Sequence, residues 1–276
     1  MAGWRCTASC RRWARRRRHL SHRPPSGARA SRGHIVGQRH AARTGADAGA
    51  GAIEDSPAFG AGAHFSDRRD AGRRLAARLE RFRGARPVVV GIPRGGVPVA
   101  AEVARALDAP LDVVLVRKVG APRNREFAIG AVAEGGVRML SAHTVRALGI
   151  SARDLEALTA GAERELAEEL GRYRGGRAPR SLSGRTVVVV DDGLATGRSA
   201  RAAIAAVSMR GAARVVLAVP VAAPESAREL CACADDVVCV QTPPDMWAVG
   251  LWYEDFSPTG DAELVALLAG GIHSGQ

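Results

Sequence analysis

Two adjacent carboxylates followed by a glycine-punctuated turn are the residues of this chain best suited to chemistry. Four valines at 187–190 run directly into Asp191 and Asp192, and the turn 193–199 adds two hydroxyls. The apolar run predicts a buried parallel strand, and the alanine-rich stretch 199–210 predicts a helix. Such a turn offers unpaired backbone N–H groups to an anion. Paired carboxylates suit sugar hydroxyls and Mg²⁺, so the pattern indicates a sugar-phosphate site.

The turn matches neither of two common phosphate-binding loops, because it lacks both Gly-Lys-Ser/Thr and Gly-x-Gly-x-x-Gly. The string instead resembles the 5-phosphoribosyl-1-diphosphate (PRPP) motif of the type I phosphoribosyltransferase family. The resemblance continues outside this motif and covers residues 65–258 of the chain. The resemblance implies that Asp191 and Asp192 hold the ribose hydroxyls and, directly or through water, Mg²⁺. It also implies a cradle for the 5-phosphate that consists of Gly193, Leu194, Ala195, Thr196, Gly197, Arg198 and Ser199. Arg198 and Ser199 depart from the family's usual residues but are compatible with phosphate binding.

A second glycine loop lies at 92–98, between an apolar run and a helical pattern. Gly95 and Gly96 let a ligand approach the backbone closely, and Arg94 offers a planar fork suited to phosphate oxygens. The resemblance implies that Arg94, Gly95 and Gly96 bind the diphosphate, with a cis peptide between Arg94 and Gly95. An ordinary glycine turn is the alternative.

Lys118 is the only lysine in a chain with 39 arginines. A sequence that uses arginine so freely can be expected to keep lysine where a compact ammonium is needed, although chance would also explain a single residue. The resembled family often places a cation at this strand end, in contact with the diphosphate. We therefore interpret Lys118, with Arg94, Asp191 and Asp192, as a catalytic residue.

The segment 119–136 combines glycines with arginines and is too irregular to predict a helix. We interpret it as a flap over the active site, matching the flexible loop of the resembled family. A surface hairpin with exposed arginines is the alternative.

The segment 242–258 holds four of the eleven aromatic residues of the chain, beside carboxylates. Flat apolar faces next to carboxylates suit a heterocyclic base, and the segment resembles the C-terminal hood of purine phosphoribosyltransferases. That resemblance implies that Trp247 stacks on the acceptor, with Trp252 and Glu254 close by. An aromatic cluster that fixes the C-terminal segment to the sheet is the alternative.

The net charge of +12 belongs to one end of the chain. Residues 1–46 hold twelve arginines and no acidic residue, which leaves 28 basic and 28 acidic residues in the rest. We expect residues 1–58 to be a disordered basic tail. It could be a nucleic-acid arm, a transit peptide or an extension from a wrongly assigned start. The neutral remainder argues against nucleic-acid binding by a folded body that spans 59–276.

Membrane and secreted classes are excluded by the sequence. No apolar run approaches the roughly 18 residues that a membrane span needs, and residues 1–30 lack the apolar core of a secretory signal. The cysteines at 231, 233 and 239 lack zinc-site spacing and are expected to be small buried thiols. We expect a cytoplasmic protein, and a homodimer is kept open.

Apolar strand patterns at 87–92, 111–116, 186–190, 214–219 and 236–240 alternate with helical patterns at 97–107, 199–210 and 224–233, and further helices are predicted at 66–82 and 151–173. This alternation predicts an α/β fold: a doubly wound, mostly parallel sheet flanked by helices, with a small C-terminal hood. Because ligands bind outside the carboxyl ends of such strands, the candidate segments should share one cleft.

Taken together, the resemblance implies an Mg²⁺-dependent transfer of the phosphoribosyl group of PRPP to a nucleobase-like nitrogen acceptor, with release of diphosphate. Two alternatives remain open. One is a PRPP-sensing regulator that binds nucleic acid without catalysis, and the other is a hydrolase that acts at the same cleft.

Overall fold

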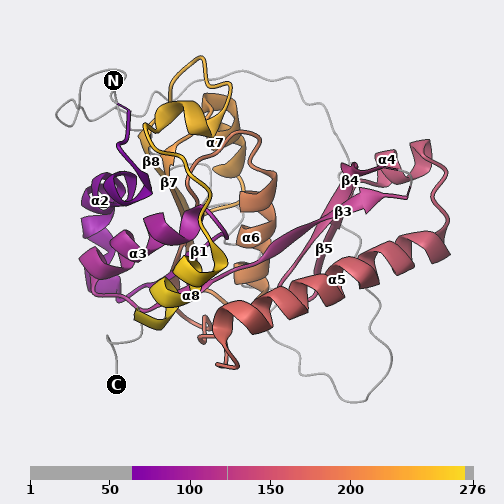
Figure 1. Cartoon of the computed structure of the whole chain (residues 1–276), viewed down its shortest axis with the longest axis horizontal. Helices are drawn as coiled ribbons and strands as arrows, with labels where there is room; N and C mark the ends of the chain where they lie inside the picture. The colour runs from indigo at the N-terminus through magenta and orange to yellow at the C-terminus, as the bar shows by residue number, and fades with distance from the viewer. Residues whose placement is uncertain (1–63, 123, 271–276) are drawn as a thin grey trace, which may run out of the picture.

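The computed structural model describes residues 64–122 and 124–270, and Figure 1 shows their arrangement. The predicted basic tail, residues 1–58, lies outside the described residues. No helix in the described ranges is both long enough and apolar enough to cross a membrane.

The centre of the fold is a five-stranded sheet in the order β2-β1-β6-β7-β8. All four neighbouring pairs are parallel. The strands are β1 (Val88–Gly91), β2 (Leu111–Val113), β6 (Thr186–Val190), β7 (Arg214–Val221) and β8 (Asp236–Gln241). Their valine-rich sequences are buried because helices cover both faces.

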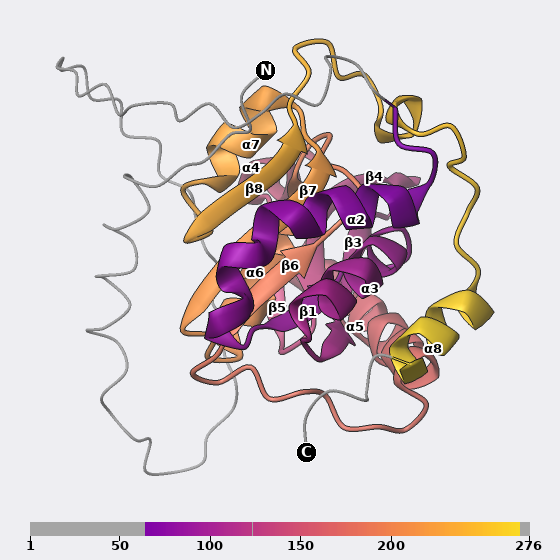
Figure 2. The ribbon, with the colours of Figure 1, turned by 90° about the vertical axis from the view of Figure 1, so that its left-hand side faces the viewer.

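Alternate strand residues enter two separate cores, as the two-residue period of a strand requires. Val188 and Val216 pack in one core with α2 (Arg68–Leu79), α3 (Gly96–Leu107) and α8 (Asp261–Gly270). Val187 and Leu217 pack in the other with α6 (Arg198–Met209) and α7 (Pro224–Leu230). Figure 2 shows α2 and α3 on the near face of the sheet and α6 behind it. The predicted doubly wound parallel sheet is confirmed.

The helix at 151–173 was predicted closely, whereas the one at 66–82 begins differently. The Ser151 side chain accepts a hydrogen bond from the Asp154 N–H at 3.1 Å and starts α5 (Ala152–Arg174). In α2 the cap is Asp67, so the helix begins at Arg68 rather than at 66, and the Asp67 carboxylate accepts from the Asp70 N–H at 2.6 Å. The predicted helix then tightens into η1 (Glu80–Ala85).

A second, antiparallel sheet extends from the main one in the order β3-β4-β5. It consists of β3 (Val116–Ala121), β4 (Asn124–Ala133) and β5 (Val137–Leu140), followed by α4 (Ala142–Ala147), and α5 runs along it (Figure 1). The predicted single strand at 111–116 is therefore wrong, because β2 ends at Val113 and the chain leaves the main sheet as β3.

The interpretation as a flap assumed that the segment 119–136 is irregular, but most of it forms strands. It contains the end of β3, all of β4 and the turn into β5, and β3 pairs with β4 with register shifts between Val119 and Ala121. The backbone is thus that of the alternative, a hairpin. Its closure over a site stays a prediction.

The cysteines follow the expectation of small apolar thiols. Cys231 and Cys239 are buried and Cys233 is half-buried, and none of the three forms a disulfide within the described residues. Burial raises the pKa of the Cys239 thiol to about 12, so this thiol stays protonated and inert.

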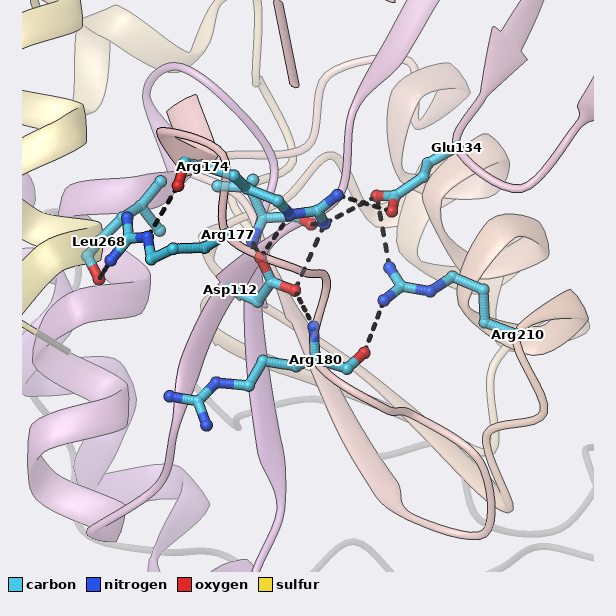
Figure 3. A network of polar contacts seen from close by, with 8 residues as sticks. Asp112, Glu134, Arg174, Arg177, Arg180, Arg210 and Leu268 are labelled. Atoms are coloured by element: carbon cyan, nitrogen blue, oxygen red, sulfur yellow. Dashed lines mark hydrogen bonds and ion pairs between the residues drawn. The ribbon is translucent and has the colours of Figure 1, made fainter. Parts of the chain in front are cut away.

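A network of buried charges joins the two sheets (Figure 3). Arg174, near the end of α5, donates through Nε to Asp112 of β2 at 3.1 Å and through Nη1 to Glu134, in the turn after β4, at 2.8 Å. Arg210 pairs with the same Glu134 at 3.3 Å. Because Arg174 neutralises both carboxylates in a desolvated place, it fixes the second sheet against the first.

Arg174→Leu should therefore destabilise the protein strongly, by about 3–5 kcal/mol, because two buried carboxylates lose their partner. Urea unfolding measures this change. The control is Arg69→Leu, which removes an exposed pair with Glu263 and should change stability by about 0.5 kcal/mol or less. Equal effects of the two substitutions would contradict the structural role given to Arg174.

Candidate sugar-phosphate site

The twin aspartates lie where the buried strand β6 leaves the main sheet. Asp191 Oδ1 accepts a hydrogen bond from the Asp192 N–H at 3.0 Å. Asp192 Oδ2 accepts from Arg68 Nε at 2.9 Å, and the Asp192 side chain is 16% exposed. Both carboxylates thus sit at the surface end of a rigid element, in a place with limited access to water.

The glycine loop contacts the aspartates because β1 and β6 are neighbours in the sheet and end at the same edge. A Cβ on Gly96 would lie 2.7 Å from the carbonyl oxygen of Val190 and 2.9 Å from Cα of Asp191. A Cβ on Gly95 would lie 1.8 Å from Oδ2 of Asp192. Only glycine permits this approach, so the structure brings the two loops predicted from sequence together.

The carboxylate pair is electrostatically strained. Burial, and then the charge of Asp192, raises the pKa of Asp191 well above its ordinary value. Burial also raises the pKa of Asp192, although the Arg68 guanidinium works in the opposite direction. Two desolvated carboxylates with one cation between them favour a ligand that brings hydroxyl donors or positive charge.

The turn 193–199 is anchored by its backbone and by one apolar side chain. The Leu194 N–H donates to Val221 O at 2.9 Å, its carbonyl accepts from the Ala223 N–H at 2.8 Å, and the side chain is buried. Gly197 begins α6 with a left-handed φ of +68°, and no side chain of the described residues caps that helix. The first N–H groups of α6 are therefore available to an anion, as the phosphate cradle requires.

The two predicted catalytic cations differ in their surroundings. Arg94 is half-exposed, and its Nε lies 3.2 Å from Oδ1 of Asp261 at the start of α8. The Lys118 side chain is exposed on β3 and forms no hydrogen bond or ion pair with the described side chains. Its neighbour Arg117 is paired with Glu165 and Glu169 of α5, so of these two consecutive cations it is Lys118 that is available to a ligand. A diphosphate role for either Arg94 or Lys118 remains a prediction.

The glycine loop contains a cis peptide, but at a different bond from the one predicted. It joins Pro93 to Arg94, one residue before the expected bond between Arg94 and Gly95. The family resemblance predicted the right loop, because the glycine pattern identifies it. It predicted the wrong bond, because the pattern does not fix the alignment of single residues within the loop.

The hood is held to the body by aromatic packing and backbone bonds. Phe65 and Tyr253 form a buried cluster with Phe256 at its edge. The Phe65 N–H donates to Trp252 O at 2.8 Å, and the Glu254 N–H donates to Phe65 O at 2.8 Å. The alternative interpretation, an aromatic cluster that fixes this segment, therefore describes most of the aromatic residues.

Trp247 differs from that cluster, because it is 87% exposed. The Trp252 ring instead stacks on His64, with centroids 6.0 Å apart. Glu254 is exposed. Their exposure allows Trp247 and Glu254 to contact an acceptor base. Trp252 has less ring surface for such a contact, because its ring stacks on His64.

Sequence reasoning missed Arg68, which joins α2 to the twin aspartates and to the hood. Its guanidinium donates to Asp192 and to Ser257 O at 2.7 Å, and it lies 3.9 Å from the ring centre of Phe256. In the sequence Arg68 is one of several arginines on a helix, so its spacing gives no signal. Tyr253 was also missed as a polar partner: its hydroxyl donates to Asp192 O at 2.6 Å.

Gly96→Ala should disrupt the junction of the two loops, because the added methyl group meets backbone atoms of β6 that cannot rotate away. We expect a loss of about 1–3 kcal/mol in the free energy of unfolding, measured by chemical denaturation. Gly84→Ala is the matched control, since nothing lies within 4 Å of its added Cβ. A Gly96→Ala protein as stable as this control would show that the loops are not in contact.

Asp191→Asn should stabilise the protein by about 1 kcal/mol at pH 7, because it removes a buried charge whose pKa is raised in the folded state. An elevated folded-state pKa lowers stability above that pKa. The advantage of the variant should therefore shrink as pH falls through the raised pKa toward the ordinary value of 3.8. Asp192→Asn should gain less, since Arg68 loses its partner. Melting temperatures between pH 4 and 8 measure both effects, and destabilisation by Asp191→Asn at pH 7 would contradict this account.

Comparison with known proteins agrees with this geometry. The family model for the phosphoribosyl transferase domain matches residues 66–255. A Mycobacterium tuberculosis protein named "Putative phosphoribosyl transferase Rv0571c" is 47% identical over 204 residues, which are 74% of this chain and 46% of the relative. The same identity and coverage hold for its counterpart in strain CDC 1551. The chain thus spans about half the length of these curated relatives.

Among solved structures, the crystal structure of TT1426 from Thermus thermophilus superposes with a TM-score of 0.66 at 47% identity. The match covers 76% of this chain and 99% of the other. The parallel sheet, the paired aspartates beyond β6 and the extent of these matches lead to one conclusion: the chain belongs to the phosphoribosyl transferase family.

Proposed function

We propose that the protein transfers the phosphoribosyl group of PRPP to a nucleobase-like nitrogen acceptor, with Mg²⁺ and with release of diphosphate. The observation that carries the proposal is the contact of the two loops at neighbouring strand ends, Gly95 and Gly96 against Asp191 and Asp192. PRPP carries a diphosphate and two vicinal hydroxyls on one ring, so its binding needs both kinds of loop side by side. The membership of the family supports the same substrate class.

The donor set fits Mg²⁺ bound together with the substrate. Mg²⁺ prefers oxygen ligands and commonly takes one or two carboxylates plus phosphate oxygens. Asp191 and Asp192 offer two half-buried carboxylates, and burial is the main cause of the raised pKa of each. No group of three or more His, Cys, Asp or Glu side chains within the described ranges could hold a metal, which agrees with a site that substrate oxygens complete.

In the reaction, the bond between the anomeric carbon and diphosphate breaks as the acceptor nitrogen approaches from the opposite face. Positive charge develops on the ribose, and Asp191 and Asp192 stabilise it while holding the hydroxyls. Negative charge develops on diphosphate, where Arg94 and Lys118 are the protein cations assigned to it. Bound Mg²⁺ would supply further positive charge to the leaving group.

The turn 193–199 and the N-terminus of α6 bind the 5-phosphate, far from the bond that breaks. This remote contact fixes the sugar for attack. The hairpin of β3 and β4 excludes water if it closes over the site, so that PRPP is not hydrolysed. Trp247 supplies a free aromatic face for the acceptor ring, with Glu254 as a hydrogen-bond acceptor at its edge.

Calorimetry with PRPP and Mg²⁺ tests the substrate, and an assay of diphosphate release over a panel of nucleobases tests the reaction. We expect binding by the full chain, loss of at least tenfold in affinity for Asp191→Asn/Asp192→Asn, and diphosphate release with at least one base. Absence of PRPP binding by the unmutated protein would overturn the proposal.

The two assays together also separate the alternatives. Binding of PRPP without diphosphate release for any base would favour a PRPP-sensing regulator. Turnover of PRPP at the same rate with and without a base would favour a hydrolase.

A further inference from the structure

A cavity of about 510 Å³ lies at the opposite end of the sheet from the candidate active site. Its walls include Pro87 and Pro110, which immediately precede β1 and β2, and Arg185, which immediately precedes β6. The aspartates and the glycine loop follow the carboxyl ends of β6 and β1. The cavity is therefore separated from that site by the length of the sheet, and the mechanism above does not use it.

Three arginines line this cavity: Arg86, Arg180 and Arg185. None of them pairs with a carboxylate in the part of the chain that the structure describes, whereas arginines elsewhere commonly do so. Asp108 is the single acidic residue of the lining. The cavity thus gathers an excess of positive charge, which favours an anion with more than one charge.

The backbone fixes these arginines while leaving most of their donors free. The Arg180 N–H donates to Asp112 at 3.0 Å, and its carbonyl accepts from Arg210 at 2.7 Å. Figure 3 shows the Arg180 guanidinium pointing away from that network, with no partner drawn. Arg185 Nη2 donates to the carbonyl of Arg86 at 2.8 Å, so one donor holds the wall in place and the others remain available.

We propose that this cavity binds a nucleotide that carries two or more phosphates. Guanidinium groups bind phosphate oxygens through paired N–H donors, and three of them exceed what a single phosphate needs. The volume lies within the range of small-molecule sites. Pro87 and Pro110 provide apolar walls for the base, and Asp108 provides an acceptor for sugar hydroxyls.

Titration of the full chain with ATP in EDTA, by calorimetry, tests the proposal. Arg180→Gln/Arg185→Gln should weaken ATP binding at least tenfold. The charge-matched control is Arg146→Gln/Arg153→Gln, which removes two exposed arginines at the ends of α4 and α5 and should leave affinity within twofold. The single change Arg180→Gln, which keeps both backbone bonds of Arg180, should weaken binding at least threefold and covers the case in which the double variant does not fold.

Photocrosslinking with 8-azido-ATP locates the bound nucleotide, because the phosphate turn 193–199 is a competing position. Labelled peptides should contain residues 86–88, 108–110 or 180–185. The proposal is overturned if the unmutated protein does not bind ATP, if the control weakens binding as much as the cavity variant, or if labelling is confined to 191–199.

Discussion

The site depends on one steric constraint, the close approach of two backbones at the carboxyl ends of β1 and β6. Parallel neighbours end at the same edge, but their loops can touch only where side chains are missing. Gly95 and Gly96 supply that space, and any larger residue would meet Asp192 or the backbone of β6. This contact places the carboxylates directly against the start of α3. The fold as a whole can be understood as the support that holds these two strands in register.

A second constraint is electrostatic, and it opposes stability. Burial raises the pKa of both Asp191 and Asp192, the charge of Asp192 raises the pKa of Asp191 further, and the Arg68 guanidinium opposes both shifts. Such unfavourable placements are typical of sites that gain the missing interactions from a ligand. Arg68 also contacts Phe256 and Ser257, so the same cation couples the carboxylates to the hood. Charge at the site and docking of the C-terminal segment are thereby linked.

The central sheet could be predicted from sequence because its signals are local. Four consecutive valines and glycine-rich turns after strands specify buried strands and their exits, and the parallel order follows from the alternation with helices. The path of 111–140 could not be predicted in the same way. Its strands pair with one another and with α5 through Arg117, Arg138 and their glutamate partners, and such pairing depends on residues distant in the chain. The role of Arg68 could not be predicted for the same reason, since its partner Asp192 lies 124 positions away in the sequence.

Tyr173 and Arg174 are consecutive residues at the end of α5, yet their contacts lead to two different places, the glycine loop after β1 and the arginine-lined cavity. The Tyr173 hydroxyl donates to Glu169 and lies 3.2 Å from Oδ1 of Asp261, the same oxygen that pairs with Arg94 of the glycine loop. Arg174 joins Asp112 and, through it, the backbone of Arg180. The last turn of this helix therefore contacts both places. Because α5 is 23 residues long and packs against the second sheet, a change in its tilt would move the contacts of Tyr173 and Arg174 together.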